Sequence, residues 1–207
     1  MRRGIIFGGL IASATALSAG DIQETNSPSL IWERDIGGGF KENTFQVGLS
    51  AGRGWGAHIF GSEAIHDVAL AYLNAGWIFT DVELPDTWLR GNWELRGEIF
   101  GGEQLRPERY IVGITFPTFR YHLATGTRVV PFVQLGAGGT VTDIKGPDLS
   151  TTLEFNLHMG AGVNYFITER VAFSLEYRLF HLSNARIETP NHGVNSHLVL
   201  AGLSYWF

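Results

Sequence analysis

Two residues near the end of the chain, His181 and Ser183, have the side chains and the spacing best suited to chemistry. A serine hydroxyl is a poor nucleophile until a neighbouring base takes its proton, and histidine often serves as that base. Residues i and i+2 of a strand lie roughly 6.5 Å apart, so contact between them requires the strand to end or bend there. The imidazole also needs a third group that orients it. The pair therefore indicates an incomplete site for acyl transfer.

The segments that carry these residues are predicted to be strands, because apolar and polar residues alternate along most of the chain. About eight segments show this period of two. They lie near residues 43–53, 66–79, 90–101, 109–121, 128–139, 153–166, 171–183 and 195–207. Each is long enough to cross a bilayer, which takes about 9–11 tilted residues.

The alternation leaves open which face of a barrel looks inward, since a soluble lipocalin-like barrel and a membrane barrel differ in that respect. Three features favour the membrane barrel. In the last segment the alternating apolar residues continue to Phe207, as they do in the final strand of bacterial outer-membrane barrels. The polar positions that alternate with the apolar ones carry charges of both signs, at Glu94, Arg96, Glu98, Glu176 and Arg178. Aromatic residues lie near segment ends, at Trp55, Trp77, Phe79, Phe119, Tyr121, Tyr165, Phe166, Tyr205 and Trp206. The sequence therefore predicts an all-β fold, an eight-stranded antiparallel transmembrane β-barrel in the bacterial outer membrane.

The start of the chain has the layout of a secretory signal peptide. Arg2 and Arg3 precede an apolar run, and small residues follow at positions 18–20. We expect residues 1–20 to be the signal peptide and residues 21–207 to form a single barrel domain. Residues 21–42 are mixed in composition and rich in glycine, and we expect a loosely ordered lead-in there.

Composition excludes several other kinds of function. The chain has no cysteine, which excludes disulfide frameworks, cysteine-based zinc sites and thiol catalysis. A formal net charge of −5 argues against a nucleic-acid partner. The seven histidines show no shared metal-ligand spacing, so we expect neither a metal nor a cofactor.

Three polar residues are predicted on the lipid-facing wall. In the seventh segment, the alternate residues predicted to face outward end with His181 and Ser183. In the eighth segment, the outward-facing residues begin at Asn195. The two segments pair through an extracellular connection, so these side chains should cluster near the outer edge of the lipid zone. Polar groups are costly on a lipid face. They either have left the bilayer and solvate a loop base, or they form a site.

The run from His181 through Asn184, followed by residues 190–195, resembles the active-site hairpin of the lipid A 3-O-deacylase (PagL-type) family. That resemblance implies His181 as general base, Ser183 as nucleophile and Asn184 in the oxyanion hole. It also implies an ester hydrolase that removes an acyl chain, the 3-O chain in that family, from lipid A of lipopolysaccharide. The partners are then lipopolysaccharide and the outer-membrane lipid. The sequence leaves undecided whether the chain forms a homodimer.

One residue departs from the best-known family pattern, which has glutamate twelve positions after the serine. This chain has Asn195 there, which can orient His181 but cannot stabilise its charged form. Glu188 in the outer loop is a second candidate for that role. Two rival functions stay open: a non-catalytic structural or adhesive barrel, and a lipid A acyltransferase.

Overall fold

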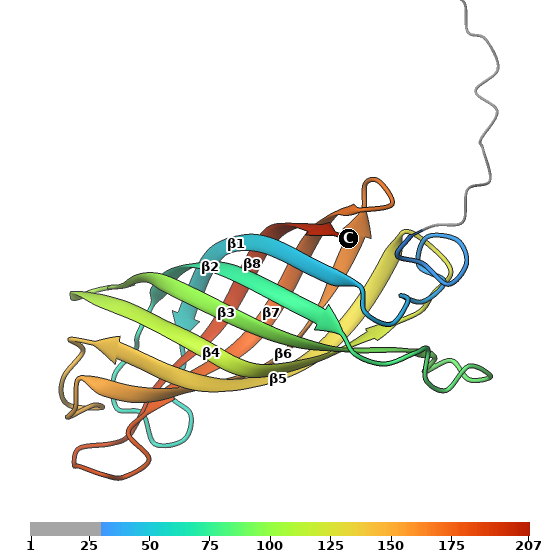
Figure 1. Ribbon diagram of the computed structural model, residues 1–207. Helices are drawn as coiled ribbons and strands as arrows, with labels where there is room; N and C mark the ends of the chain where they lie inside the picture. The colour runs from blue at the N-terminus through green and yellow to red at the C-terminus, as the bar shows by residue number, and fades with distance from the viewer. Residues whose placement is uncertain (1–29) are drawn as a thin grey trace, which may run out of the picture.

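The structure, a computed structural model, describes residues 30–207, which form a closed antiparallel barrel. Its strands are β1 (Phe45–Gly56), β2 (Val68–Ile78), β3 (Gly91–Leu105), β4 (Glu108–Leu123), β5 (Val129–Thr142), β6 (Leu153–Phe166), β7 (Val171–Ser183) and β8 (Val194–Trp206). Each strand pairs with the next, and β8 returns to β1 (Figure 1). The predicted fold is confirmed. The predicted signal peptide, residues 1–20, lies outside the described residues. Within residues 30–207 no helix is long and apolar enough to cross a membrane.

Large apolar side chains cover the outside of the barrel. Leu49 of β1 pairs with Leu73 of β2, which pairs with Ile99 of β3, and more than half of each side chain is exposed. Such a continuous apolar belt is unfavourable in water and is the arrangement expected against lipid. The lipocalin-like alternative, with the apolar parity inside, is therefore excluded.

The charged side chains at the polar positions of the strands fill the barrel interior, as predicted. Arg178 donates two hydrogen bonds to the Glu98 carboxylate, at 2.6 and 2.7 Å, and also pairs with Glu176. Arg96 lies 2.9 Å from the same Glu98 carboxylate. All these side chains are buried. Opposite charges thus compensate one another in a lumen that side chains occupy, as expected for eight strands.

Two interior partners on β4 were missing from the prediction. Arg120 donates to Glu176 at 2.9 Å, and the His122 ring lies 2.7 Å from Glu94. The register of β4 shifts at a β-bulge between Thr115 and Thr118. A bulge moves every later side chain to the opposite face, so a period-two reading along the whole strand assigns half of it incorrectly.

We expect Arg178→Ala to lower the free energy of unfolding by about 3–5 kcal/mol, because it leaves Glu98 and Glu176 buried without their main partner. The measurement is urea unfolding of the barrel in detergent. Arg186→Ala, which removes an exposed loop arginine, is the matched control and should unfold like the parent. A parental midpoint for Arg178→Ala would contradict the interior network.

The end of the barrel where β1 begins, which is predicted to be periplasmic, is plugged by the segment that precedes β1. Phe40 stacks between Trp32 and Trp206, with 4.4 Å between ring centroids on either side. Asn92 fixes the Phe40 backbone through hydrogen bonds at both its N–H and its carbonyl. The expectation of a loosely ordered lead-in is therefore wrong for residues 30–42. Glycines in this segment permit tight turns around an aromatic anchor rather than loss of structure.

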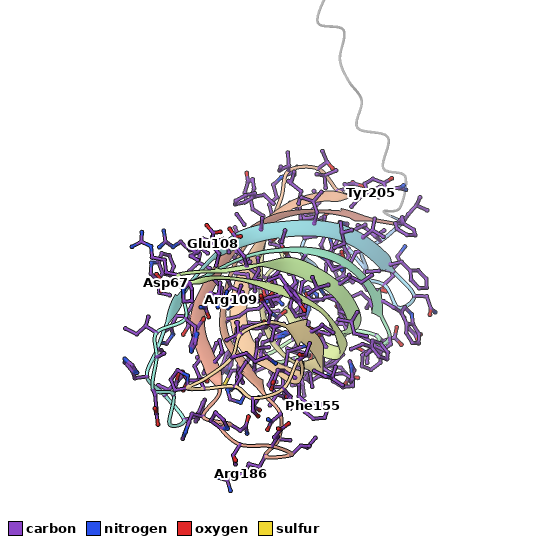
Figure 2. The ribbon with its side chains drawn as sticks, turned by 90° about the vertical axis from the view of Figure 1, so that its left-hand side faces the viewer. Asp67, Glu108, Arg109, Phe155, Arg186 and Tyr205 are labelled. Atoms are coloured by element: carbon purple, nitrogen blue, oxygen red, sulfur yellow. The ribbon has the colours of Figure 1, made fainter. Side chains whose placement is uncertain are left out.

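The opposite end, which is predicted to be extracellular, carries the connections that surround the candidate site. These are residues 57–67 between β1 and β2, 143–152 between β5 and β6, and 184–193 between β7 and β8, and they gather at the left of Figure 1. An apolar cluster that includes Leu149, Leu182 and Val194 packs in the barrel beneath them. Figure 2, viewed from this end, shows Arg186 at the tip of the β7–β8 loop, on the same side of the barrel as Phe155.

Candidate active site

His181 and Ser183 occupy the last outward positions of β7. His181 lies opposite Leu157 of β6 and Asn195 of β8, and Ser183 lies opposite Phe155. Strand β7 ends at Ser183, which meets the condition that the two side chains need for contact. Both residues are half-buried and line the same cavity, so the predicted base and nucleophile share one site at the edge of the apolar belt.

The third predicted residue, Asn195, touches the imidazole directly. Its Oδ1 lies 2.7 Å from His181 Nδ1. Its Nδ2 donates to the carbonyl of Ile59 at 2.8 Å and to that of Gly193 at 3.4 Å. Because these carbonyls accept only, Nδ2 must face them and Oδ1 must face the ring. His181 then carries its proton on Nδ1 and leaves Nε2 free to act as a base.

The Ser183 hydroxyl has no hydrogen bond to His181 or to any other side chain of residues 30–207. Catalytic hydrogen bonds are often loose without substrate and shorten in the complex. The predicted contact between His181 and Ser183 is therefore not formed in this structure, in which Ser183 is still paired with Phe155 of β6.

The predicted oxyanion residue, Asn184, is buried, and all its N–H groups are hydrogen-bonded, whereas its Oδ1 has no partner among the described residues. Its Nδ2 donates to Ser150 Oγ and to the carbonyl of Glu188, both at 3.0 Å. Its backbone N–H donates to Asn191 Oδ1 at 2.9 Å. A direct role for Asn184 would require one of these bonds to be released. The same contact orients Asn191, whose Nδ2 makes no hydrogen bond with the described residues.

The turn before β8 packs closely against the imidazole. Gly193 has a φ of +83°, and a Cβ placed there would lie 2.6 Å from His181 Cε1. Only glycine fits this backbone without strain. Glu188, the second candidate for orienting the base, is exposed and makes no hydrogen bond or ion pair with His181 within the described chain. The structure places Asn195 at the position where that partner is needed.

A cavity of about 580 Å³ opens beside these side chains on the outer wall. Its lower part is apolar, formed by Leu135, Leu157, Met159 and Leu179. Its upper part contains His181, Ser183, Asn191 and His192, with Arg186 at the rim. Phe60 of the β1–β2 loop meets the His181 ring edge-on at 5.8 Å. The cavity therefore combines a serine hydroxyl, an imidazole and an arginine with an apolar groove. No group of side chains in the described part of the chain is arranged to hold a metal ion.

Comparison with known proteins decides the family. A sequence model described as Lipid A 3-O-deacylase (PagL) matches residues 66–204, which include His181, Ser183 and Asn195. The chain belongs to the lipid A 3-O-deacylase (PagL) family. Members of this family are ester hydrolases, and the chain is accordingly a lipid A deacylase by family. The predicted family and the predicted enzyme class are confirmed.

Solved structures agree on the fold. The crystal structure of the outer membrane enzyme PagL is 20% identical, with a TM-score of 0.55 over 75% of this chain and 97% of that one. Neisserial surface protein A is 17% identical, with a TM-score of 0.56 over 80% of this chain and all of the other. The attachment invasion locus protein Ail of Yersinia pestis is 12% identical, with a TM-score of 0.50 over 81% and 100%. A comparison with curated protein sequences found no match.

Proposed function

We propose that this chain removes an ester-linked acyl chain, the 3-O chain, from lipid A within the outer leaflet of the outer membrane, through a Ser183–His181–Asn195 site on its lipid-facing wall. The observation that carries the proposal is the 2.7 Å contact between His181 Nδ1 and Asn195 Oδ1, which completes a base beside an outward serine. If these polar residues only interacted with water at the base of the loop, Asn195 would not need to be buried with its amide bonded to His181 on one side and to the Ile59 and Gly193 carbonyls on the other.

The cavity explains how a bulky lipid reaches the site. A lipid A molecule already lies with its acyl chains parallel to the barrel wall, so it can enter sideways without leaving the membrane. The apolar side chains Leu157, Met159 and Leu179 would contact the acyl chain below the ester. Arg186 and His192 at the rim would face the phosphorylated sugars. The polarity of the cavity thus matches that of the substrate along the membrane normal.

The reaction follows the usual course of serine acyl transfer. Ser183 Oγ attacks the ester carbonyl carbon while its proton passes to His181 Nε2. The tetrahedral oxyanion is held by N–H donors of the β7–β8 turn, for which Asn191 Nδ2 and the predicted Asn184 are candidates. The intermediate collapses, and the sugar hydroxyl leaves with the proton from Nε2. Water, activated by the same His181, then releases the fatty acid from Ser183.

The experiment is incubation of the purified, folded chain with lipopolysaccharide in detergent, followed by analysis of the released fatty acid and the lipid A product. Release of one 3-hydroxy fatty acid from an O-linked position supports the proposal. Intact lipid A at all enzyme concentrations would favour a structural or adhesive barrel. Transfer of the chain to another lipid, instead of release, would favour an acyltransferase.

The orientation of the barrel can be tested because the chain has no cysteine. A cysteine in place of Glu188, in the β7–β8 loop, should react with a membrane-impermeant thiol reagent on intact cells. A cysteine in place of Glu169, between β6 and β7, should react only after the outer membrane is opened. The reverse pattern would place the site on the periplasmic side, away from lipopolysaccharide.

A further inference from the structure

A buried cluster at the extracellular mouth, centred on Asp148, stands outside the catalytic residues. Asp148 lies in the β5–β6 loop and its side chain is fully buried. Its carboxylate accepts hydrogen bonds from the backbone N–H of Glu63 at 2.7 Å and of Ala64 at 2.9 Å. It also lies 2.7 Å from His66 Nε2, while His66 Nδ1 lies 2.5 Å from Gln104. A carboxylate with so many partners fixes the segment that supplies them.

The same residue also holds the opposite side of the candidate site. The backbone carbonyl of Asp148 accepts hydrogen bonds from the N–H groups of His192 at 2.9 Å and Gly193 at 3.1 Å. Asp148 therefore ties the β1–β2 loop, through its side chain, to the turn before β8, through its backbone. Burial alone would raise the pKa of Asp148, but the bonds from Glu63, His66 and Ala64 outweigh it and lower that pKa. The group is thus held as a carboxylate.

These two segments are the ones that determine the amide orientation of Asn195. The β1–β2 loop supplies the Ile59 carbonyl, and the turn supplies the Gly193 carbonyl, that accept from Asn195 Nδ2. The loop is also bound to β8 on either side of that contact. Ala57 N–H donates to the Asn195 carbonyl at 2.9 Å, and Ser196 Oγ donates to the His66 carbonyl at 2.7 Å.

We propose that Asp148 is a positioning residue: by holding Ile59 and Gly193 against Asn195, it keeps the amide oxygen on His181 and so fixes the reactive tautomer of the base. This inference rests on the proposed function, because it assigns a cause to the geometry of that site. An amide can rotate by half a turn and present its NH₂ group to the ring, which would force the proton onto Nε2 and remove the base. A carboxylate has two equivalent oxygens and needs no such control. Asp148 is thus needed because position 195 is an asparagine.

The test compares Asp148→Asn in the parent and in an Asn195→Asp background. In the parent we expect Asp148→Asn to lower kcat by about 10²-fold, as small misplacements of catalytic groups do. In the Asn195→Asp background the same change should have little effect, because either carboxylate oxygen accepts from Nδ1. Glu108→Gln is the matched control, since its exposed side chain lies at the same end of the barrel and makes no hydrogen bond or ion pair within the described residues, so it should leave both backgrounds unchanged.

The second readout is the His181 tautomer, followed by ¹⁵N NMR of the folded barrel in micelles at a pH where the ring is neutral. We expect the Nδ1–H form in the parent and a mixture of tautomers in Asp148→Asn. Equal kcat losses in both backgrounds, with an unchanged tautomer, would overturn the inference. If Asp148→Asn does not fold, His66→Gln, which removes one of the bonds to Asp148, is measured in the same way. The NMR result decides the inference even for a parent that leaves lipid A intact, an outcome that would contradict only the proposed function.

Discussion

Ser183→Ala and His181→Ala should each abolish release of the acyl chain from lipid A, with a loss of kcat of up to about 10⁶-fold. The reason is that nucleophile and base act as a unit, so either change removes the covalent route. For the same reason the double variant should be no slower than the single variants. The measurement is the rate of fatty-acid release by purified barrel, with folding checked by heat-modifiable migration on a gel.

Two matched controls separate this effect from damage to the barrel. Ser174→Ala changes a serine on the same strand that faces the lumen, and its partner residue in β8 is Gly202. His197→Ala changes a histidine on the same outer wall, whose Nδ1 lies 2.6 Å from Tyr177 Oη. Both should stay near the parental rate. If Ser183→Ala or His181→Ala also did so, the site would lie elsewhere.

Asn195→Leu should lower kcat by about 10⁴-fold, the size of effect that a wrong histidine tautomer has in a serine protease. Leucine has similar volume but offers no acceptor to His181 Nδ1, and it leaves the Ile59 carbonyl without its donor. Asn195→Asp should be slowed far less, because its carboxylate accepts the same bond and stabilises the charged ring, although it too leaves the Ile59 carbonyl without a donor.

The pair of variants also tests whether asparagine suffices at this position. A parental rate for Asn195→Leu would show that another group, such as Glu188, orients the base. In that case Glu188→Gln should lower the rate in the Asn195→Leu background and not in the parent. Loss of activity in both Asn195 variants together with loss of folding would assign Asn195 to stability instead.

The regular strands were predictable because their signal is local. Strands β6 and β7 begin and end where the alternation of apolar residues begins and ends, at Leu153–Phe166 and Val171–Ser183. The β-bulge in β4 escaped the reading by alternation alone, although Pro117 lies within it and proline inside a strand is a signal for a bulge. The aromatic plug was missed because Trp32 and Phe40 find their partner, Trp206, at the other end of the chain.

The site was predictable to the extent that it lies on strands. Parity placed His181, Ser183 and Asn195 on one outward face, and the register of β7 with β8 puts His181 opposite Asn195. The burial of Asn195 was not predictable, because it comes from Ile59, which is 136 positions away in the sequence. His66 and Asp148 gave no signal either. Single titratable residues in loops acquire a partner only when the loops meet.

The most direct test of the central claim is the mass of lipid A from cells that express the parent or Ser183→Ala at equal levels in the outer membrane. We expect a lipid A species in parental cells that lacks one O-linked 3-hydroxyacyl chain, and its complete absence in Ser183→Ala cells. Identical lipid A in the two strains, whether both are deacylated or neither is, would contradict a Ser183-dependent lipid A deacylase.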